Sequence, residues 1–188
     1  MSQAAAVDWS TLPAPVDDGS ANHLPGVRLP SVALHATNGT CINLASLKGK
    51  TVVYAYPRTG EPGVAVPPEW DMIPGARGCT PQSCAFRDHS ADLKALGVDH
   101  LFGLSTQDTA YQREVVERLH LPFPLLSDEH LTLTRALDLP TFETSGMVLL
   151  KRLTMVIQDG VIEHVFYPVF PPDRNAADVV ACLQANRT

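Results

Sequence analysis

The sequence has few aromatic residues, no cluster of positive charge and no long apolar run. Its 14 Lys and Arg residues are outnumbered by 20 Asp and Glu residues, which gives a formal net charge of -6. Because nucleic-acid binding depends on clustered Lys and Arg, this balance argues against nucleic acid as a partner. No stretch reaches the roughly 18 apolar residues of a membrane span, and residues 1–25 lack the basic start and apolar run of a secretion signal. We therefore expect a cytoplasmic protein that has no membrane partner.

The composition also argues against several kinds of site. The 7 histidines are scattered without the paired spacing of zinc sites, so we expect no metal and no cofactor. The 4 cysteines include no Cys-x-x-Cys motif, and without a secretion signal we expect them to be reduced at rest. The length of 188 residues and the 45% hydrophobic content fit one globular domain. We expect an extended N-terminal arm over residues 1–26 and a single domain over residues 27–188.

Hydrophobic patterns predict strands that alternate with helices. A strand at 51–56, a helix and a second strand at 101–105 predict a right-handed parallel crossover. The turns Asn38-Gly39 and Asp159-Gly160 each predict a hairpin. Further elements are expected as strands at 123–126, 147–150 and 153–157, and as helices from Asp108 to 119, at 131–139 and at 175–183. The sum is an α/β protein with a central mixed sheet flanked by helices, a thioredoxin-like arrangement.

Cys79 lies at a predicted helix start. Thr80 can cap the helix, Pro81 suits its first turn, and an apolar face continues until Gly97 ends it. The exposed N–H groups and the positive end of the helix dipole favour an anion there, which here means the nucleophilic thiolate. In sheets of this kind the site usually lies beyond the carboxyl ends of the strands, where the end of strand 51–56 would place Cys79.

Cys84 follows Cys79 by five residues in the same predicted helix. Residues five apart on an ideal helix have Cα atoms about 8.6 Å apart, beyond the roughly 7 Å limit for a disulfide. If the two cysteines pair, the first turn must unwind, which suits a catalytic cycle better than a structural crosslink. Of the other cysteines, Cys41 is expected as a small core residue in a strand at 41–44, and Cys182 as a packing residue of the last helix.

A long irregular loop, residues 58–78, leads into Cys79. It is rich in Pro and Gly and also contains Trp70 and Ile73. Loops of this length inside a compact domain are usually functional or disordered. The two large side chains could form an apolar lid over the site, or they could equally anchor the loop or form an interface.

Short motifs follow one another in a specific order between residues 32 and 183. They are Tyr56-Pro57, Gly78-Cys79-Thr80 with Cys84 five residues on, Phe86-Arg87-Asp88, Gly103-Leu104-Ser105-Thr106, Phe123-Pro124-Leu125-Leu126-Ser127-Asp128, and Arg152 with Thr154 ahead of Asp159-Gly160. In this order and spacing the chain resembles the peroxiredoxins, and among them the Q-type or bacterioferritin comigratory subfamily.

The resemblance implies a thiol-dependent peroxidase for hydrogen peroxide and organic hydroperoxides. The family's peroxidatic cysteine matches Cys79, which would become a sulfenic acid. The resolving cysteine matches Cys84, which would form an intramolecular disulfide with Cys79, and a thioredoxin-like reductant would restore both thiols. The family's active-site arginine matches Arg152, which would stabilise the thiolate and bind the peroxide oxygen. A monomer or a weak dimer is expected.

The match to the family is incomplete in the active-site loop. The family has a Pro seven residues before the reactive cysteine and a Thr three residues before it, where this chain has Met72 and Ala76. We interpret Pro57 and Thr59 as the equivalents, with an insertion after them. Thr59 is thus the fourth predicted catalytic residue, and it would fold back to orient Cys79 and peroxide.

Two other functions stay open at this point. A redoxin-fold sensor or partner-binding protein with weak or no peroxidase turnover is the main alternative, and turnover with thioredoxin would distinguish the two. A disulfide reductase is disfavoured because that activity normally uses Cys-x-x-Cys.

Overall fold

The strand β3 (Lys50–Ala55) forms the centre of the fold. Five of its six side chains are buried, and its Val and Tyr residues favour the extended conformation. It pairs in parallel with β4 (Val98–Ser105) and antiparallel with β8 (Leu153–Gln158). A strand that is buried on both faces requires packing elements on both sides of the sheet.

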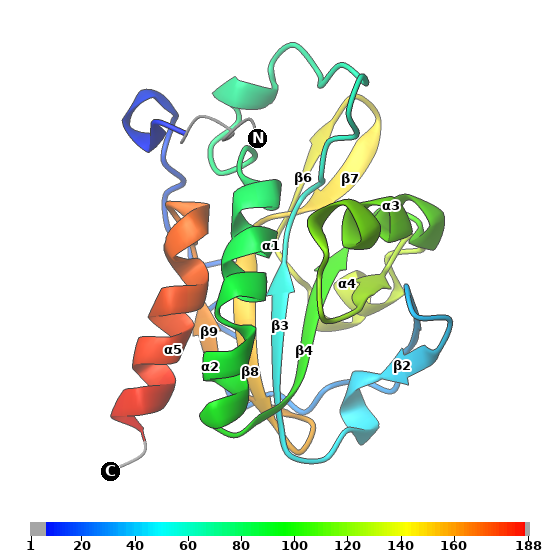
Figure 1. Cartoon of the computed structure of the whole chain (residues 1–188), viewed down its shortest axis with the longest axis vertical. Coiled ribbons are helices and arrows are strands. Elements are labelled where there is room, and N and C mark those ends of the chain that lie inside the picture. The colour runs from blue at the N-terminus through cyan, green and yellow to red at the C-terminus, as the bar shows by residue number, and fades with distance from the viewer. Residues whose placement is uncertain (1–6, 187–188) are drawn as a thin grey trace.

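A computed structural model, which describes residues 7–186, gives the sheet seven strands in the order β2-β1-β5-β4-β3-β8-β9 (Figure 1). Residues 1–6 and 187–188 lie outside the described part. A separate two-stranded sheet joins β6 and β7. The remaining strands are β1 (Ala33–Ala36), β2 (Cys41–Asn43), β5 (Leu125–Ser127), β6 (Thr141–Thr144), β7 (Met147–Leu150) and β9 (Val161–Phe166).

Helices cover both faces of the sheet. Figure 1 shows α1 and α2 in front of β8 and next to β3, with α5 beside α1 at the left of the view. Buried residues from these helices and from α3 share one core with β3, whereas those of α4 belong to the core on the opposite face. The helices are α1 (Cys79–Asp88), α2 (Ser90–Ala95), α3 (Thr109–Leu119), α4 (Thr132–Leu137) and α5 (Asn175–Ala185), and short 3-10 helices cover Trp9–Thr11, Leu44–Ser46, Trp70–Met72 and Pro172–Arg174.

Several sequence predictions are confirmed by this architecture. The sheet is mixed, β3 and β4 form the parallel crossover, and hairpins occur at Asn38-Gly39 and Asp159-Gly160. The side chain of Asp108 caps α3 by accepting a hydrogen bond of 2.8 Å from the backbone N–H of Tyr111. The local signals that predicted these elements were therefore sufficient.

One helix prediction was wrong, and one strand was missed. The helix predicted to run from Cys79 to Gly97 is two helices. His89, with φ of -95° and ψ of 5°, leaves the helical conformation and separates α1 from α2. Strand β6 was not predicted at all. It pairs with β7 across Ser145 and Gly146, whose φ angles of 50° and 74° match a tight hairpin turn, so the Ser-Gly dipeptide was the signal that could have revealed it.

The prediction that Cys41 is a small core residue was also wrong. Cys41 lies on β2, an edge strand of the large sheet, and its side chain is exposed. Its sulfur lies 3.5 Å from Nδ1 of His35 on β1. A strand with only one face packed on the core points every second side chain to solvent, and Cys41 is on the solvent side.

The division into an arm at residues 1–26 and a domain at 27–188 stays a prediction, and residues 1–6 lie outside the described part. Within the described segment, Ala21 and Leu24 are buried in the core with β1 and α4. Asp18 accepts hydrogen bonds from Lys151 (2.7 Å) and from Tyr167 (2.8 Å), so side-chain contacts tie this segment to the β7–β8 connection and to the end of β9. Among residues 7–186 no helix is long and apolar enough to cross a membrane.

Candidate active site

The first turn of α1 presents Cys79 beyond the carboxyl end of β3. Gly78 is the residue before the helix, and its φ of 114° is a left-handed conformation that glycine adopts readily. Cys79 is thus the first helical residue, as the sequence predicted, whereas the predicted cap Thr80 lies inside the helix and does not cap it. Backbone N–H groups at this end of a helix have no helical partner and favour an anion beside Cys79.

Gly78 is also closely surrounded. A Cβ atom at this position would lie 2.6 Å from Cγ of Pro172 and 2.8 Å from Cη2 of Trp9. Trp9 is held there by a hydrogen bond of 2.9 Å from its Nε1 to Asp173, and its ring meets Phe170 edge to face. The described N-terminal segment therefore packs directly on the start of α1.

Arg152, which precedes β8, lies against the sulfur of Cys79. Its Nη2 atom is 3.3 Å from Cys79 Sγ, and both side chains are only 4% exposed. The same nitrogen lies 3.1 Å from the carbonyl oxygen of Ala76 and 3.2 Å from that of Gly75. A guanidinium keeps its charge when buried, so this arrangement fixes a positive charge where a negatively charged sulfur or oxygen atom would be stabilised.

A buried chain of hydrogen bonds links Arg152 to α5. Gln82 accepts from Nη1 of Arg152 through Oε1, and its Nε2 donates to Oδ1 of Asn175 over 2.9 Å. Thr154 donates to the same oxygen over 2.6 Å. All of these side chains are buried. Neither Gln82 nor Asn175 was predicted as a functional residue; the one signal in the sequence was that Thr154 and Arg152, two residues apart, share a face.

Cys84 lies on α1 five residues after Cys79, and no disulfide joins them: all four cysteines lie in the described part of the chain and are free. Because one unbroken helix contains both, the ideal-helix separation of about 8.6 Å applies and a disulfide requires the first turn to unwind. Cys84 is half-buried, and burial raises the pKa of its thiol, with Asp88 adding to the rise and Arg87 and Arg118 opposing it. Cys84 is thus biased toward the neutral thiol.

Thr59 is a predicted site residue whose hydroxyl bonds to another partner than Cys79. Its hydroxyl and its backbone N–H both donate to Oε1 of Gln107, over 3.2 Å and 3.1 Å. Gln107 returns a hydrogen bond of 3.2 Å to the carbonyl of Thr59. These bonds anchor the start of the 58–78 loop, and the side chain at Ala76 has no donor to offer Cys79.

A cavity of about 320 Å³ leads to Cys79. Its lining includes Val66 and Trp70 from the loop and Pro81 from α1. Trp70 is itself buried, and its ring centroid lies 6.3 Å from that of Phe142 on β6. Trp70 thus anchors the loop on the small sheet and at the same time forms a wall of the cavity.

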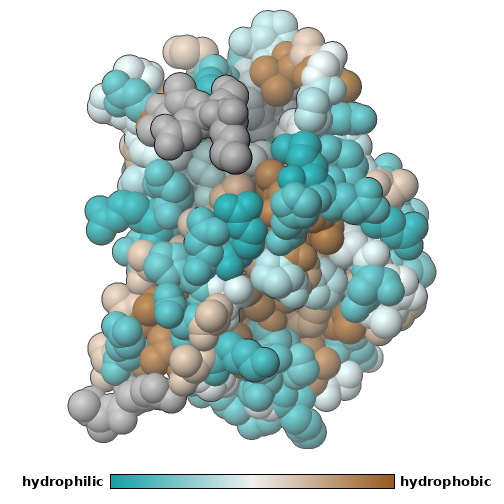
Figure 2. All heavy atoms as spheres, viewed as in Figure 1, coloured by the Kyte–Doolittle hydropathy of each residue, from teal (hydrophilic) through white to brown (hydrophobic). Residues whose placement is uncertain are grey.

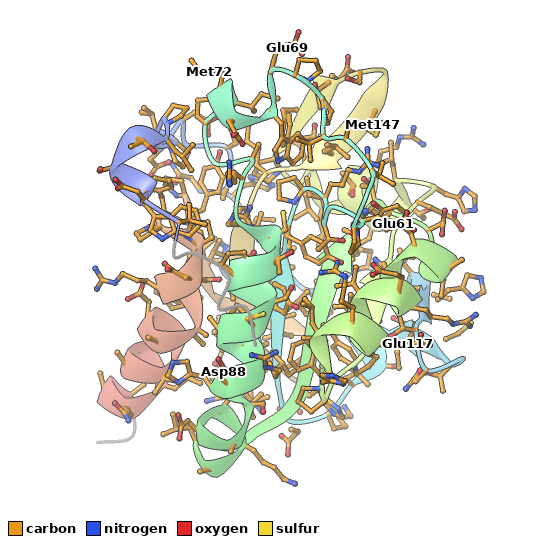
Figure 3. All side chains as sticks on the ribbon, turned by 45° about the horizontal axis from the view of Figure 1, so that its top comes forward. Glu61, Glu69, Met72, Asp88, Glu117 and Met147 are labelled. Atoms are coloured by element: carbon orange, nitrogen blue, oxygen red, sulfur yellow. The ribbon has the colours of Figure 1, made fainter. Side chains whose placement is uncertain are left out.

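The outer side of the loop is exposed. In Figure 3 Glu69 and Met72 lie at its outer edge, and Met147 of β7 lies near its other side. Arg58 at the start of the loop donates from Nη1 to the sulfur of Met147 over 3.2 Å. Within residues 7–186, no group of three or more His, Cys, Asp or Glu side chains could hold a metal ion.

This sheet order, with its covering helices, is that of the thioredoxin-like α/β class, as the sequence predicted. Within that class the chain belongs to the redoxin family, because the family model described as Redoxin matches residues 24–182. The match covers every strand of the large sheet as well as Cys79, Cys84 and Arg152.

Individual relatives carry more specific names. Chloroplastic peroxiredoxin Q of Oryza sativa subsp. japonica is 28% identical over 161 residues, which are 85% of this chain and 66% of that protein. Putative peroxiredoxin bcp of Coxiella burnetii is 29% identical over 163 residues, 84% of this chain and 97% of the relative. The crystal structure of peroxidoxin BcpB from Mycobacterium tuberculosis superposes with a TM-score of 0.70 at 26% identity, over 88% of this chain and 100% of that one.

The predicted resemblance to Q-type peroxiredoxins is confirmed by these relatives. The chain spans only 66% of the length of the rice protein. The insertion predicted after Thr59 stays a prediction.

Replacement of Gly78 by alanine should destabilise the protein, because alanine resists the left-handed conformation and its Cβ would overlap Trp9 and Pro172. We expect Gly78→Ala to lower the free energy of unfolding by more than the ~1–2 kcal/mol of backbone strain alone, measured by urea denaturation. Gly97→Ala is the matched control, since Gly97 has a φ of 87° but open space around it. Equal losses in the two variants would contradict the packing argument.

The raised pKa of Cys84 should appear in its alkylation. The test uses a Cys79→Ser background and measures the rate of Cys84 alkylation by iodoacetamide as a function of pH. We expect the midpoint of this pH profile to lie at higher pH in the folded protein than in the urea-unfolded protein, because burial disfavours the thiolate. Peptide mapping separates Cys84 from the exposed Cys41. A folded-state profile at or below the unfolded one would refute the effect of burial.

Proposed function

We propose that the chain is a thiol-dependent peroxidase in which Cys79 attacks the peroxide. The observation that carries this proposal is the contact of 3.3 Å between Nη2 of Arg152 and Sγ of Cys79 at the start of α1. The helix N-terminus and the guanidinium both stabilise negative charge, first on the sulfur and then on the peroxide oxygen. Membership of the redoxin family and similarity to proteins named peroxiredoxin support the same conclusion.

The first step breaks the O–O bond of the peroxide. The thiolate of Cys79 attacks one oxygen of ROOH, the sulfur becomes a sulfenic acid, and the other oxygen leaves as RO⁻, which takes up a proton to give an alcohol or water. The sulfur is oxidised by two electrons and the peroxide is reduced by two. Arg152 donates to the reacting oxygen atoms in this step, a role supported by the 3.3 Å contact between its Nη2 and the sulfur of Cys79.

The second step forms an intramolecular disulfide. The thiol of Cys84 attacks the sulfur of the Cys79 sulfenic acid and water leaves, so the two-electron oxidation first held by the sulfenic sulfur is shared by the two sulfur atoms of the disulfide. The first turn of α1 must unwind for this bond to form. A dithiol reductant of the thioredoxin type then reduces the disulfide and is itself oxidised to a disulfide. The two cysteine thiols supply the two electrons that reduce the peroxide, so the reaction uses no cofactor.

Hydrogen peroxide and organic hydroperoxides are the proposed substrates. A cavity of about 320 Å³ at Cys79 has room for an organic group, and Val66 and Trp70 give it apolar walls. One solved relative of 22% identity is described as having alkyl peroxide reduction activity, which is said of that protein. The proposal includes a cytoplasmic location, a monomer or weak dimer, and a domain at residues 27–188 preceded by an N-terminal arm.

An exposed apolar group on the loop favours a second candidate, a redox sensor or partner-binding protein with weak peroxidase turnover. Val64, Val66 and Met72 are more than half exposed at 51%, 53% and 74%. Figure 2 shows apolar side chains at the top of this face, over the loop. A surface of this kind next to a reactive thiol is suited to contact with another protein.

One titration separates the two functions. We expect one equivalent of hydrogen peroxide to convert the reduced protein to a Cys79–Cys84 disulfide, as read by peptide mapping. Cys79→Ser should consume no peroxide, and Cys84→Ser should consume peroxide once and then stall or form a sulfinic acid. Slow oxidation spread over Cys41 and Cys182 would refute the peroxidase and favour the sensor.

The guanidinium of Arg152 should be essential to the peroxide step. We expect Arg152→Lys to lower the second-order rate constant for peroxide by about 10²–10³, the usual cost of losing one oriented donor to a developing oxyanion. Lysine keeps the charge but cannot reach Cys79, Gln82 and the loop carbonyls together. Stopped-flow peroxide consumption measures the effect, and a rate constant within twofold of the wild-type value would refute the role.

Thr59 is proposed to replace the threonine that the family has at the position of Ala76, and its bond to Gln107 would have to break for its hydroxyl to reach Cys79. We expect Thr59→Val to slow the peroxide step about fivefold, the effect of one neutral hydrogen bond. Thr106→Val is the control, since that hydroxyl donates to the carbonyl of Val148. An unchanged rate in Thr59→Val would reject Thr59 as a catalytic residue.

A further inference from the structure

The hydrogen bonds between α1 and α5 converge on one oxygen atom. Oδ1 of Asn175, at the first position of α5, accepts from Gln82 of α1 over 2.9 Å and from Thr154 of β8 over 2.6 Å. Asn175 is 1% exposed. It belongs to none of the motifs by which the chain resembles its relatives, and it makes no contact with the reacting sulfur among the hydrogen bonds of the described residues.

The direction of these hydrogen bonds is fixed by Arg152. A guanidinium can only donate, so the amide of Gln82 must turn its oxygen toward Nη1 of Arg152. The amide nitrogen of Gln82 then faces Asn175, which must accept with Oδ1. An acceptor at Asn175 is therefore required for Gln82 to hold Arg152 in the orientation that places Nη2 on Cys79.

Gln82 also belongs to the segment that must move. It lies three residues after Cys79, and its backbone N–H closes the first turn of α1 on the carbonyl of Gly78 over 3.0 Å. Unwinding of this turn, which a Cys79–Cys84 disulfide requires, displaces Gln82 and separates it from both Arg152 and Asn175. The bond from Gln82 to Asn175 consequently opposes unwinding.

From this geometry we propose that Asn175 is a positioning residue that controls whether oxidised Cys79 forms a disulfide or a sulfinic acid. Acting through Gln82, it keeps Arg152 on the thiolate for the peroxide step and keeps the first turn of α1 wound after that step. The inference rests on the proposed peroxidase function, and it adds a residue that acts on the balance between two reactions of the sulfenic acid.

The two reactions compete for one intermediate. In one, the thiol of Cys84 attacks the sulfenic sulfur, water leaves and the disulfide forms. In the other, a second ROOH transfers an oxygen atom to the same sulfur, which becomes a sulfinic acid while ROH leaves. Only the first reaction needs α1 to unwind, so a stronger hold on the first turn favours the sulfinic acid.

Asn175→Ala removes the acceptor and should change the two steps in opposite directions. We expect the second-order rate constant for hydrogen peroxide to fall, because Arg152 loses its fixed partner. We expect the ratio of disulfide to sulfinic acid at a fixed excess of peroxide to rise about fivefold, the effect of one lost hydrogen bond on the unwinding equilibrium. Mass spectrometry of the cysteine peptides gives the ratio, and stopped-flow measurement gives the rate constant.

Three further variants separate this role from a structural one. Asn175→Asp keeps an oxygen acceptor at the same place and should restore both values. Val179→Ala removes packing from a buried position of the same helix and should lower the melting temperature without a change in the ratio. Gln82→Leu cuts the same link from the α1 side, and adding Asn175→Ala to it should cause no further change in the ratio, because the two residues act in series.

The outcomes are distinguishable from a failure of the proposed function. A wild-type protein that forms neither disulfide nor sulfinic acid with hydrogen peroxide would refute the peroxidase itself. A wild-type protein that reacts, together with an Asn175→Ala variant of unchanged ratio, would overturn the role of Asn175 alone. If Asn175→Ala does not fold, Gln82→Leu tests the same link, and an unchanged ratio in that variant would be equally decisive.

Discussion

The contact between Arg152 and Cys79 is the interaction on which the site depends. It joins residues 73 positions apart in the sequence, one at the start of α1 and one just before β8. Antiparallel pairing of β8 with β3 brings Arg152 to the carboxyl end of β3, where the chain leaves the sheet toward α1. Burial of both side chains strengthens the electrostatic effect, because water is excluded from the charged group and the sulfur.

The first turn of α1 has two requirements that conflict. Reaction with peroxide needs the turn wound, since only then do the helix N-terminus and Arg152 act on the same sulfur. Disulfide formation needs it unwound, since Cys79 and Cys84 are too far apart on an intact helix. Gln82, which belongs to this turn, accepts a buried hydrogen bond from Arg152 and donates one to Asn175, and unwinding of the turn breaks both.

The segments that surround the start of α1 lie outside the sheet. Trp9 and Pro172 close around Gly78, and Trp70 fixes the long loop on the β6–β7 hairpin. Residues 7–23 precede the part of the chain that the redoxin family model matches. The family model therefore covers the core of the fold. Much of the wall around Cys79 comes from irregular segments, in which no hydrophobic period predicts a helix or a strand.

The sequence by itself determined the α/β class, most of the strands and the position of Cys79 at a helix start, because hydrophobic period, turn dipeptides and helix signals are local. The resemblance added Arg152 and the role of Cys84 as the resolving cysteine. Only the tertiary structure decided that Arg152 touches the sulfur, that Gln82 and Asn175 support it, that Thr59 bonds to Gln107 and that Cys41 is exposed. Such contacts join residues distant in the chain, and their partners depend on how strands and helices pack, which no local pattern encodes.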